Sequence, residues 1–369
     1  MQNRKKIQIA GPTVGVGEER AVLNVLRSGM LAQGVQVERF EEEFAKYCGV
    51  KYAVAVANGT CALHLALLAC GIGAGDEVIT TPFSFIATAN AITFTGAKPV
   101  FVDIEKDSFN IDPKKIVSKI TKKTKAILPV HLFGNPADMA AIHKIAKEHN
   151  LKVVEDACQA HGAVFEGKKV GSIGDFGCFS FYPTKNMTTG EGGMVTTNTK
   201  SYYEKIKLLR NHGMKKRYYH EMIGFNYRMT DINAAIGTVQ LQKLPDFNKR
   251  RVQIAKQYSM KLSFVPEIIM PQMQSGSVFN QYSILVPRKL RDKLFDFLSD
   301  NGIHAGIYYP VPIHMQKPYR GSGKYPVSEI ISKQIVSLPI YPGLTGEQIA
   351  LISRSVLKFF SKKQKSKKQ

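Results

Sequence analysis

Short apolar segments alternate with helical patterns through the first half of the chain. Five segments are short, apolar and rich in β-branched residues, as buried strands are: 51–56, 77–80, 99–104, 126–130 and 151–155. Between them, apolar and polar positions predict helices at 60–69, 86–94, 113–120 and 136–148. Strands and helices that alternate at this spacing predict an α/β fold with a mainly parallel sheet covered on both faces.

The pattern changes near Pro245. Residues 231–244 predict a helix that ends at this proline, and a more polar helix follows at 246–261. The remaining predicted elements are a strand at 282–286 and helices at 290–301 and 346–360. We therefore predict a large domain over residues 13–245 and a smaller C-terminal α/β domain over residues 246–360, with residues 1–12 packed nearby. Residues 361–369 form a lysine-rich tail, which we expect to be disordered.

The chain is strongly basic, with 369 residues and a formal net charge of +22. Part of this charge lies in residues 356–369, which contain six lysines and no acidic residue. The other lysines are spread over several segments, and no RNP-like, zinc-finger or KH signature accompanies them. A solvated lysine surface, able to attract phosphates of a sugar nucleotide, is therefore favoured over nucleic-acid binding.

The cysteines and the hydropathy of the chain indicate the cellular compartment in which the protein is expected. The first residues carry positive charge without an apolar segment behind them, and no apolar run approaches the roughly 18 residues that cross a bilayer. The five cysteines are scattered and form no CxxC pair: Cys48, Cys61, Cys70, Cys158 and Cys178. We expect a cytoplasmic protein that does not span a membrane and has neither a disulfide framework nor a metal site.

Asp156 and Lys185 carry the most specific chemical signal. Asp156 closes an apolar strand, and Lys185 follows in a loop just before a glycine-rich turn. An enzyme that uses pyridoxal 5'-phosphate (PLP) needs such a pair, because the amine forms a Schiff base with the aldehyde and the carboxylate keeps the pyridine nitrogen protonated. Taken singly, Asp156 can instead pair with an arginine or cap a helix, and Lys185 can be a solvated lysine.

Other residues near the ends of the predicted strands fit the same cofactor. Gly59 and Thr60 begin a helix, where backbone N–H groups and a hydroxyl can bind a phosphate, and Ser180 can add a further ligand. Phe85 can lie against the pyridine ring, and Gln159 can reach the phenolic oxygen. Each has an ordinary structural alternative, a β–α turn for Gly59-Thr60 and a core aromatic for Phe85.

Five motifs together resemble those of the DegT/DnrJ/StrS-type PLP-dependent sugar aminotransferases over about residues 15–357. They are Asn58-Gly59-Thr60, residues 81–88 (TPFSFIAT), 155–162 (EDACQAHG), 179–185 (FSFYPTK) and 224–231 (GFNYRMTD). The resemblance implies a fold-type I transferase, with a large PLP domain and a small C-terminal domain. It also implies a homodimer whose active sites are shared between subunits.

The resemblance assigns roles by position. Lys185 is implied as the Schiff-base residue, where the dehydratase branch of the family has histidine, and Asp156 as the partner of the pyridine nitrogen. The other implied cofactor contacts are Phe85 on the ring, Gln159 at the phenolic oxygen, Gly59, Thr60 and Ser180 at the phosphate, and Asn226 at the phosphate from the partner chain.

The implied reaction is a ping-pong transamination from glutamate to a nucleotide-linked keto-deoxysugar, at a C3 or C4 ketone, for amino-sugar or polysaccharide biosynthesis. Candidate substrate contacts are Arg228, Tyr309 and His314, and residues 309–314 resemble members that aminate at C3. Two alternatives remain open. One is a dehydration or elimination on the same scaffold, and the other is a non-enzymatic regulatory or nucleic-acid-binding role.

Overall fold

The structure is a computed structural model that describes residues 6–366, with side chains described as far as residue 361. Its central feature is a seven-stranded sheet with the strand order β1-β9-β8-β5-β4-β2-β3. The strands of this sheet are β1 (Tyr52–Val56), β2 (Glu77–Thr80), β3 (Lys98–Phe101), β4 (Thr124–Ile127), β5 (Lys152–Asp156), β8 (Phe176–Ser180) and β9 (Gly193–Thr197). Strand β9 runs antiparallel to both of its neighbours, and the other pairings are parallel. The predicted mainly parallel sheet is therefore confirmed.

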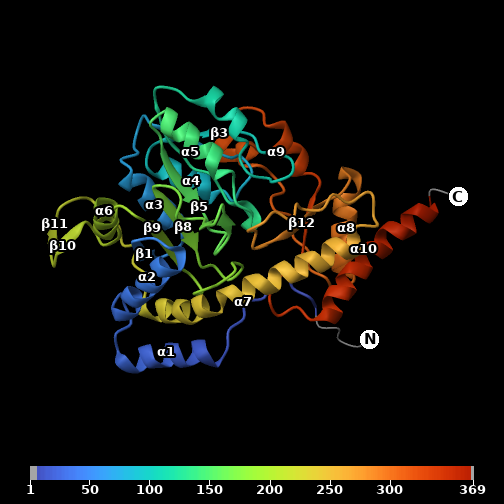
Figure 1. Cartoon of the computed structure of the whole chain (residues 1–369), viewed down its shortest axis with the longest axis horizontal. Coiled ribbons are helices and arrows are strands. Elements are labelled where there is room, and N and C mark those ends of the chain that lie inside the picture. Colours follow the sequence, from blue (N-terminus) through green and yellow to red (C-terminus); the bar gives the residue numbers. More distant parts are fainter. Residues whose placement is uncertain (1–5, 367–369) are drawn as a thin grey trace.

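The remaining elements surround this sheet or build the C-terminal part. The α-helices are α1 (Val16–Ser28), α2 (Val35–Cys48), α3 (Gly59–Ala69), α4 (Ala87–Phe94), α5 (Met139–Glu148), α6 (Lys200–Arg210), α7 (Asp231–Leu262), α8 (Arg288–Asp300), α9 (Pro326–Ile331) and α10 (Gly346–Ser366). Three small two-stranded sheets pair β6 (Val164–Phe165) with β7 (Lys168–Lys169), β10 (Met214–Lys216) with β11 (Tyr219–His220), and β12 (Tyr282–Leu285) with β13 (Ile335–Leu338). In Figure 1, α6, β10 and β11 project from one side of the molecule.

Local sequence explains how the first helix after the sheet edge is placed. Helix α3 is apolar on nearly all sides and is almost wholly buried, because it packs against β1, β5, β8 and β9. The side chain of Asn58 caps it by accepting a hydrogen bond from the N–H of Cys61 at 2.9 Å. The helix therefore begins at a fixed point beyond the carboxyl end of β1.

Helix α7 differs from the sequence-based prediction. It is a single helix of 32 residues with Pro245 inside it, rather than two helices divided at that proline. Its first half packs in the core beside the sheet through Ala234 and Leu244. Its second half packs in a C-terminal core through Ile254 and Tyr258. Because tertiary packing holds both halves, the proline does not end the helix, and Figure 1 shows α7 spanning both parts of the molecule.

The C-terminal core is built from α7, α8, α10, β12 and β13, together with the N-terminal segment. Ile7 pairs with Ile303 and is buried in this core. The packing of residues 1–12 as a whole stays a prediction, since residues 1–5 lie outside the described part. The segment from Ile313 to Tyr325 packs instead against Phe101 and Ala89 of the sheet region. The division of the chain near residue 245 therefore stays a prediction, with a connection that crosses it.

Three other elements depart from the predictions. Residues 113–120 form two 3-10 turns, η1 (Pro113–Lys115) and η2 (Val117–Lys119), and not one helix. Helix α10 continues to Ser366, beyond the predicted helix end at residue 360. The disorder of residues 361–369 stays a prediction, and residues 367–369 lie outside the described part. Two more 3-10 turns, η4 (Ile313–Met315) and η5 (Lys317–Tyr319), precede α9, where no element was predicted.

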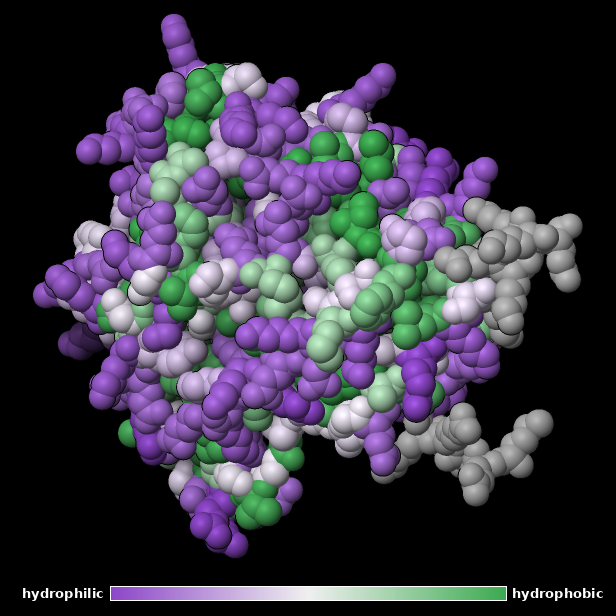
Figure 2. All heavy atoms as spheres, turned by 45° about the vertical axis from the view of Figure 1, so that its right-hand side comes forward, coloured by the Kyte–Doolittle hydropathy of each residue, from purple (hydrophilic) through white to green (hydrophobic). Residues whose placement is uncertain are grey.

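The face shown in Figure 2 is mostly hydrophilic, with separate small groups of hydrophobic side chains. Within residues 6–366, no helix has the length and apolar character needed to span a bilayer.

Candidate active site

A cavity of about 910 Å³ opens beyond the carboxyl ends of the central strands. This is the edge at which parallel α/β sheets hold their ligands. Seven of the predicted residues line it: Gly59, Thr60, Phe85, Asp156, Gln159, Ser180 and Lys185. Tyr309, predicted as a substrate contact, lines it as well. The structure therefore brings together residues that lie up to 250 positions apart in the chain.

Asp156 is fixed by its strand and by two donors. Its N–H donates to the carbonyl of Pro129 at 2.9 Å, and its own carbonyl accepts from the N–H of His131 at 3.0 Å. Its side chain is buried and accepts hydrogen bonds from the Thr88 hydroxyl at 2.8 Å and from the N–H of Cys158 at 3.2 Å. No arginine bonds to this carboxylate among the described residues, so the geometry favours the cofactor-binding interpretation over a structural ion pair.

The neighbouring residue, Glu155, has its side chain on the other face of β5, where it bonds to His131 and to the segment before β8. Its buried carboxylate accepts from Nε2 of His131 at 2.9 Å and from the N–H groups of Gly171 and Gly174, both at 2.7 Å. Burial alone would raise the pKa of Glu155, but His131 and these backbone donors outweigh it and lower that pKa. Nδ1 of His131 accepts from the N–H of Ala137 at 3.0 Å, so the ring donates through Nε2. Glu155 and His131 are thus structural.

Lys185 lies in the loop between β8 and β9, and its N–H donates to the carbonyl of Tyr182 at 2.9 Å. Burial of the amine lowers its pKa, and the nearby Cys158 and Asp156 offset only part of that effect. A larger share of the amine is therefore neutral at a given pH than for a solvated lysine. Lys185 is also the one lysine or arginine among the described residues that line the cavity.

The start of α3 forms a close-fitting cradle. A Cβ atom on Gly59 would lie 2.6 Å from Cβ of Ser180 and 3.0 Å from Sγ of Cys158, so only glycine fits there without displacement. Gly193 similarly lies against the backbone of Asn58. Backbone N–H groups at the N-terminus of a helix, beside the hydroxyls of Thr60 and Ser180, suit a phosphate. These residues therefore fit the phosphate group of PLP.

Gln159 has a defined amide orientation. Its Oε1 accepts from the N–H of Phe133 at 2.9 Å, and its Nε2 donates to the hydroxyl of Tyr309 at 3.0 Å. The amide N–H₂ therefore points along the cavity wall that Tyr309 completes. Phe85 lies opposite, with its ring centroid 6.4 Å from that of Tyr309, and it remains 56% exposed. An aromatic ring this exposed at a cavity mouth is available to stack on a ligand.

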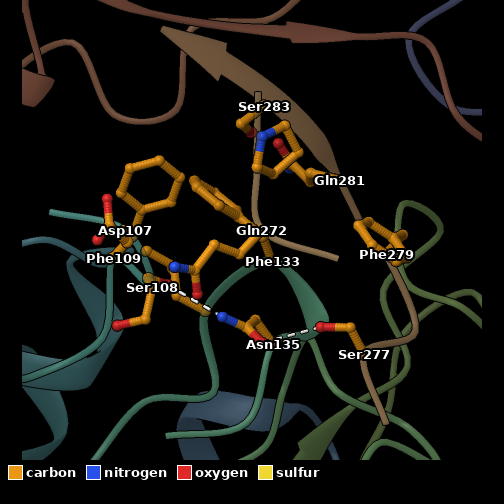
Figure 3. Close-up of a pocket in the computed structure, with 12 residues that line it drawn as sticks. Asp107, Ser108, Phe109, Phe133, Asn135, Gln272, Ser277, Phe279, Gln281 and Ser283 are labelled. Atoms are coloured by element: carbon orange, nitrogen blue, oxygen red, sulfur yellow. Dashed lines mark hydrogen bonds between the residues drawn. The ribbon is translucent and has the colours of Figure 1, made fainter. Parts of the chain in front are cut away.

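A second, much smaller hollow of about 20 Å³ lies behind Phe133 (Figure 3). Asn135 lines this hollow, and its side chain donates to the Ser108 carbonyl at 3.3 Å and accepts from the Ser277 hydroxyl at 2.9 Å. Its volume suits about one water molecule and not a substrate. Gln281 lines both this hollow and the large cavity. The bonds around Asn135 brace the turn whose N–H orients Gln159.

Three predicted residues lie outside the cavity lining. Asn226 is exposed. Arg228 donates through Nη1 to Oδ1 of Asn211 at 2.5 Å. His314 is buried, with Nε2 3.1 Å from the carboxylate of Glu329, so it is held as part of the 313–331 segment. The arrangement does not place His314 against a ligand in this cavity.

Sequence reasoning missed several residues of the cavity wall. They are Ser84, Thr88, Cys61, Cys158, His64, Glu191, Tyr227 and Tyr308. Ser84 and Thr88 lie within the motif at 81–88, Cys158 within that at 155–162 and Tyr227 within that at 224–231, and these motifs were the available signals. His64 reaches the wall from the buried helix α3, which no motif indicated. Among the described residues, no group of three or more His, Cys, Asp or Glu side chains is arranged to hold a metal ion.

Comparison with known proteins decides the family. The family model described as the DegT/DnrJ/EryC1/StrS aminotransferase family matches residues 12–357. The chain belongs to this family. The aminotransferase is 40% identical to a GDP-perosamine synthase of Escherichia coli O157:H7, over 97% of this chain and 100% of the relative. It is 42% identical to a dTDP-3-amino-3,6-dideoxy-alpha-D-galactopyranose transaminase of Aneurinibacillus thermoaerophilus, over 92% of this chain and 94% of the relative.

Solved structures support the fold and the cofactor. The structure of NtdA from Bacillus subtilis with bound cofactor PMP (pyridoxamine phosphate) matches with a TM-score of 0.90 and 32% identity, over 98% of this chain and 87% of the other. The aminotransferase is thus a fold-type I, PLP-dependent enzyme, as the motifs implied. The cradle at Gly59 and the paired Asp156 and Lys185 are the parts of this chain that fit that cofactor.

Proposed function

We propose that this aminotransferase moves an amino group from glutamate to the ketone of a nucleotide-linked deoxysugar, for amino-sugar or polysaccharide biosynthesis. The observation that carries the proposal is the placement of Lys185, Asp156 and the Gly59 cradle in one cavity large enough for a sugar as well as a cofactor. Relatives that act on GDP- and dTDP-linked sugars support the substrate class. Because those two relatives differ in nucleotide, the nucleotide itself is left to experiment.

Each residue has a role that follows from its surroundings. PLP supplies an electron sink that no side chain offers. Lys185 would hold the cofactor through its amine. Its lowered pKa leaves more of the amine neutral, which suits it to move a proton at the substrate carbon. Asp156 holds the pyridine nitrogen in its protonated form. Gln159 and Phe85 orient the ring, and Gly59, Thr60 and Ser180 bind the phosphate.

A homodimer with shared active sites completes the proposal. The cavity carries a single lysine or arginine among its described lining residues, although its proposed substrates carry several negative charges. Asn226 and the ring of Phe85 are both exposed. Helix α1, the loop after it and the start of α2 also expose apolar side chains: Val16, Leu23, Leu26, Met30, Leu31 and Val35. Such a group of apolar side chains favours a protein interface. A second copy would cover it and bring Asn226 to the partner's phosphate site.

Two further candidate contacts, Arg228 and Tyr309, remain part of the proposal as substrate-positioning residues, with Tyr309 the better placed because it lines the cavity. A cytoplasmic location is proposed because all five cysteines are free.

The first experiment is an absorbance spectrum of the protein with PLP, before and after glutamate. We expect a visible band from the cofactor bound to Lys185, loss of that band with glutamate, and release of 2-oxoglutarate. The Lys185→Ala variant should show none of these changes. Return of the visible band on adding a keto-sugar nucleotide identifies the acceptor, and NMR of the product distinguishes C3 from C4. A visible band that does not respond to glutamate would reject transamination from this donor and favour dehydration or elimination.

Shared active sites are tested by mixing two inactive variants. Lys185→Ala and Asn226→Ala should each lose activity as homodimers. If Asn226 acts on the partner's site, mixed dimers contain one site with both residues intact, and activity returns when the subunits are exchanged. No recovery, in a mixture shown by mass spectrometry to contain mixed dimers, would place both residues in the same site.

A further inference from the structure

We infer that Thr88, supported by Ser84, is a positioning residue that holds the carboxylate of Asp156 in one orientation beneath the cofactor. The inference rests on the proposed role of Asp156 as the partner of the pyridine nitrogen. Thr88 and Ser84 line the same cavity as Asp156 and Lys185, and the cofactor roles considered above involve neither of them.

The geometry defines a relay of hydroxyl groups. Oγ1 of Thr88 donates to Oδ2 of Asp156 at 2.8 Å, and Oγ of Ser84 lies 2.9 Å from Oγ1 of Thr88. An ionised carboxylate accepts hydrogen bonds and donates none. The Thr88 proton therefore points to Asp156, which leaves the Thr88 oxygen free to accept the proton of Ser84. Both hydroxyls are thus oriented towards the carboxylate.

Burial makes this relay effective. Thr88 is 1% exposed, Ser84 4% and Asp156 5%. Hydrogen bonds donated to a carboxylate in such surroundings favour its charged form and fix the rotation of the carboxylate plane. Cys158 also bonds to this carboxylate, through its N–H at the longer distance of 3.2 Å and through its thiol, a weak donor. Thr88 is therefore the main side-chain support of the group that must stay negative for the cofactor to stay protonated.

Other titratable groups face the same region. Lys185 and the thiols of Cys158 and Cys178 interact electrostatically with Asp156, as does the hydroxyl of Tyr309. Burial raises the pKa of both thiols and of the Tyr309 hydroxyl, which keeps them neutral near pH 7. Lys185 becomes bound to the cofactor in the loaded enzyme. Thr88 thus acts on the one carboxylate in this cluster.

The test compares Thr88→Val, which keeps the shape but removes the hydroxyl, with Thr88→Ser, which keeps the hydroxyl. Thr80→Val is a matched control, because Thr80 is also buried but donates to the Leu128 carbonyl at 2.8 Å. The readouts are the dissociation constant of PLP, the pH midpoint of the visible band of the loaded enzyme, and the melting temperature without cofactor.

We expect Thr88→Val to weaken PLP binding by about tenfold or more, as for a lost hydrogen bond to a charged group. The pH midpoint of the visible band should rise, because a less firmly protonated pyridine withdraws less charge from the imine nitrogen. Thr88→Ser should restore both values. Ser84→Ala should shift both in the same direction by less. Thr80→Val should lower the melting temperature and leave PLP binding unchanged.

The inference is overturned if Thr88→Val keeps the wild-type dissociation constant and pH midpoint, or if Thr88→Ser behaves like Thr88→Val. If Thr88→Val fails to fold, Ser84→Ala decides alone, and unchanged values for it overturn the relay. A wild-type protein with no visible band in PLP would instead reject the proposed function, so the two failures are distinguishable.

Discussion

The glycine at the start of α3 gives the sharpest prediction about the cofactor site. A Cβ atom at Gly59 would lie 2.6 Å from Cβ of Ser180 and 3.0 Å from Sγ of Cys158. Both distances are well below ordinary carbon contacts. Gly59→Ala must therefore push the start of α3 away from β8, and the N–H groups that begin this helix move with it.

The magnitude follows from two opposed effects. Overpacking in a buried site costs about 1–3 kcal/mol. Alanine in place of glycine in a helix regains up to about 1 kcal/mol. The net loss of stability is thus about 0–3 kcal/mol, and the variant should fold. Phosphate binding should suffer more, because loss of one backbone hydrogen bond to a charged oxygen weakens binding by about tenfold or more.

Gly346 provides the matched control. It is likewise the first residue of a helix, α10, but a Cβ atom there meets nothing within 4 Å. Gly346→Ala should therefore be neutral or stabilising, by up to about 1 kcal/mol, and should leave PLP binding unchanged. The assays are urea unfolding without cofactor and PLP titration by absorbance. If Gly59→Ala binds PLP as tightly as the wild type, the reasoning that this glycine shapes the phosphate cradle is refuted.

Three further predictions concern other parts of the chain. Burial lowers the pKa of Lys185, so its charge destabilises the cofactor-free fold below that pKa. Lys185→Met should therefore raise the melting temperature at pH 7, by a margin that shrinks as the pH approaches 10.5. An equal margin at both pH values would contradict this cause. The carboxylate of Asp231 accepts from the N–H groups of Gly34 and Val37 at the start of α2, at 2.7 and 3.0 Å. Asp231→Ala should therefore lower the free energy of unfolding in urea by about 2–4 kcal/mol. An unchanged free energy would show that water replaces the carboxylate. Tyr309→Phe should change KM for the keto-sugar, while His314→Gln should lower only the melting temperature; a KM effect of His314→Gln alone would reverse this assignment.

Much of the central sheet was predictable because its strands are buried on both sides. A strand in a parallel sheet is almost continuously apolar, and β2 begins and ends where the pattern placed it. The carboxyl ends of such strands meet at one edge, so the strand pattern alone was enough to place Asp156 and Gly59 near each other. The helix predicted at 113–120 was wrong because Asp112 and Pro113 favour the start of a helix but do not determine its length.

The parts that escaped prediction depend on contacts between distant segments. Pro245 is a strong local signal for a helix end, yet α7 passes through it because cores on both sides hold the helix. Asp231 looks like the first residue of its own helix, but its carboxylate caps α2, almost 200 positions earlier in the chain. The assembly of Thr88, Ser84 and Asp156 requires α4 to lie against the end of β5, which no single-segment pattern encodes.

The continuity of α7 has a mechanical consequence. A helix of 32 residues is about 48 Å long, and it carries side chains of both cores on one rigid rod. If either core unfolds, the apolar side chains of its half of α7 become exposed while the other half of the helix remains packed. At Pro245 the rod lacks one internal N–H donor, so bending is easiest there. Melting should therefore be a single cooperative event, with the hinge for any smaller motion lying at that proline.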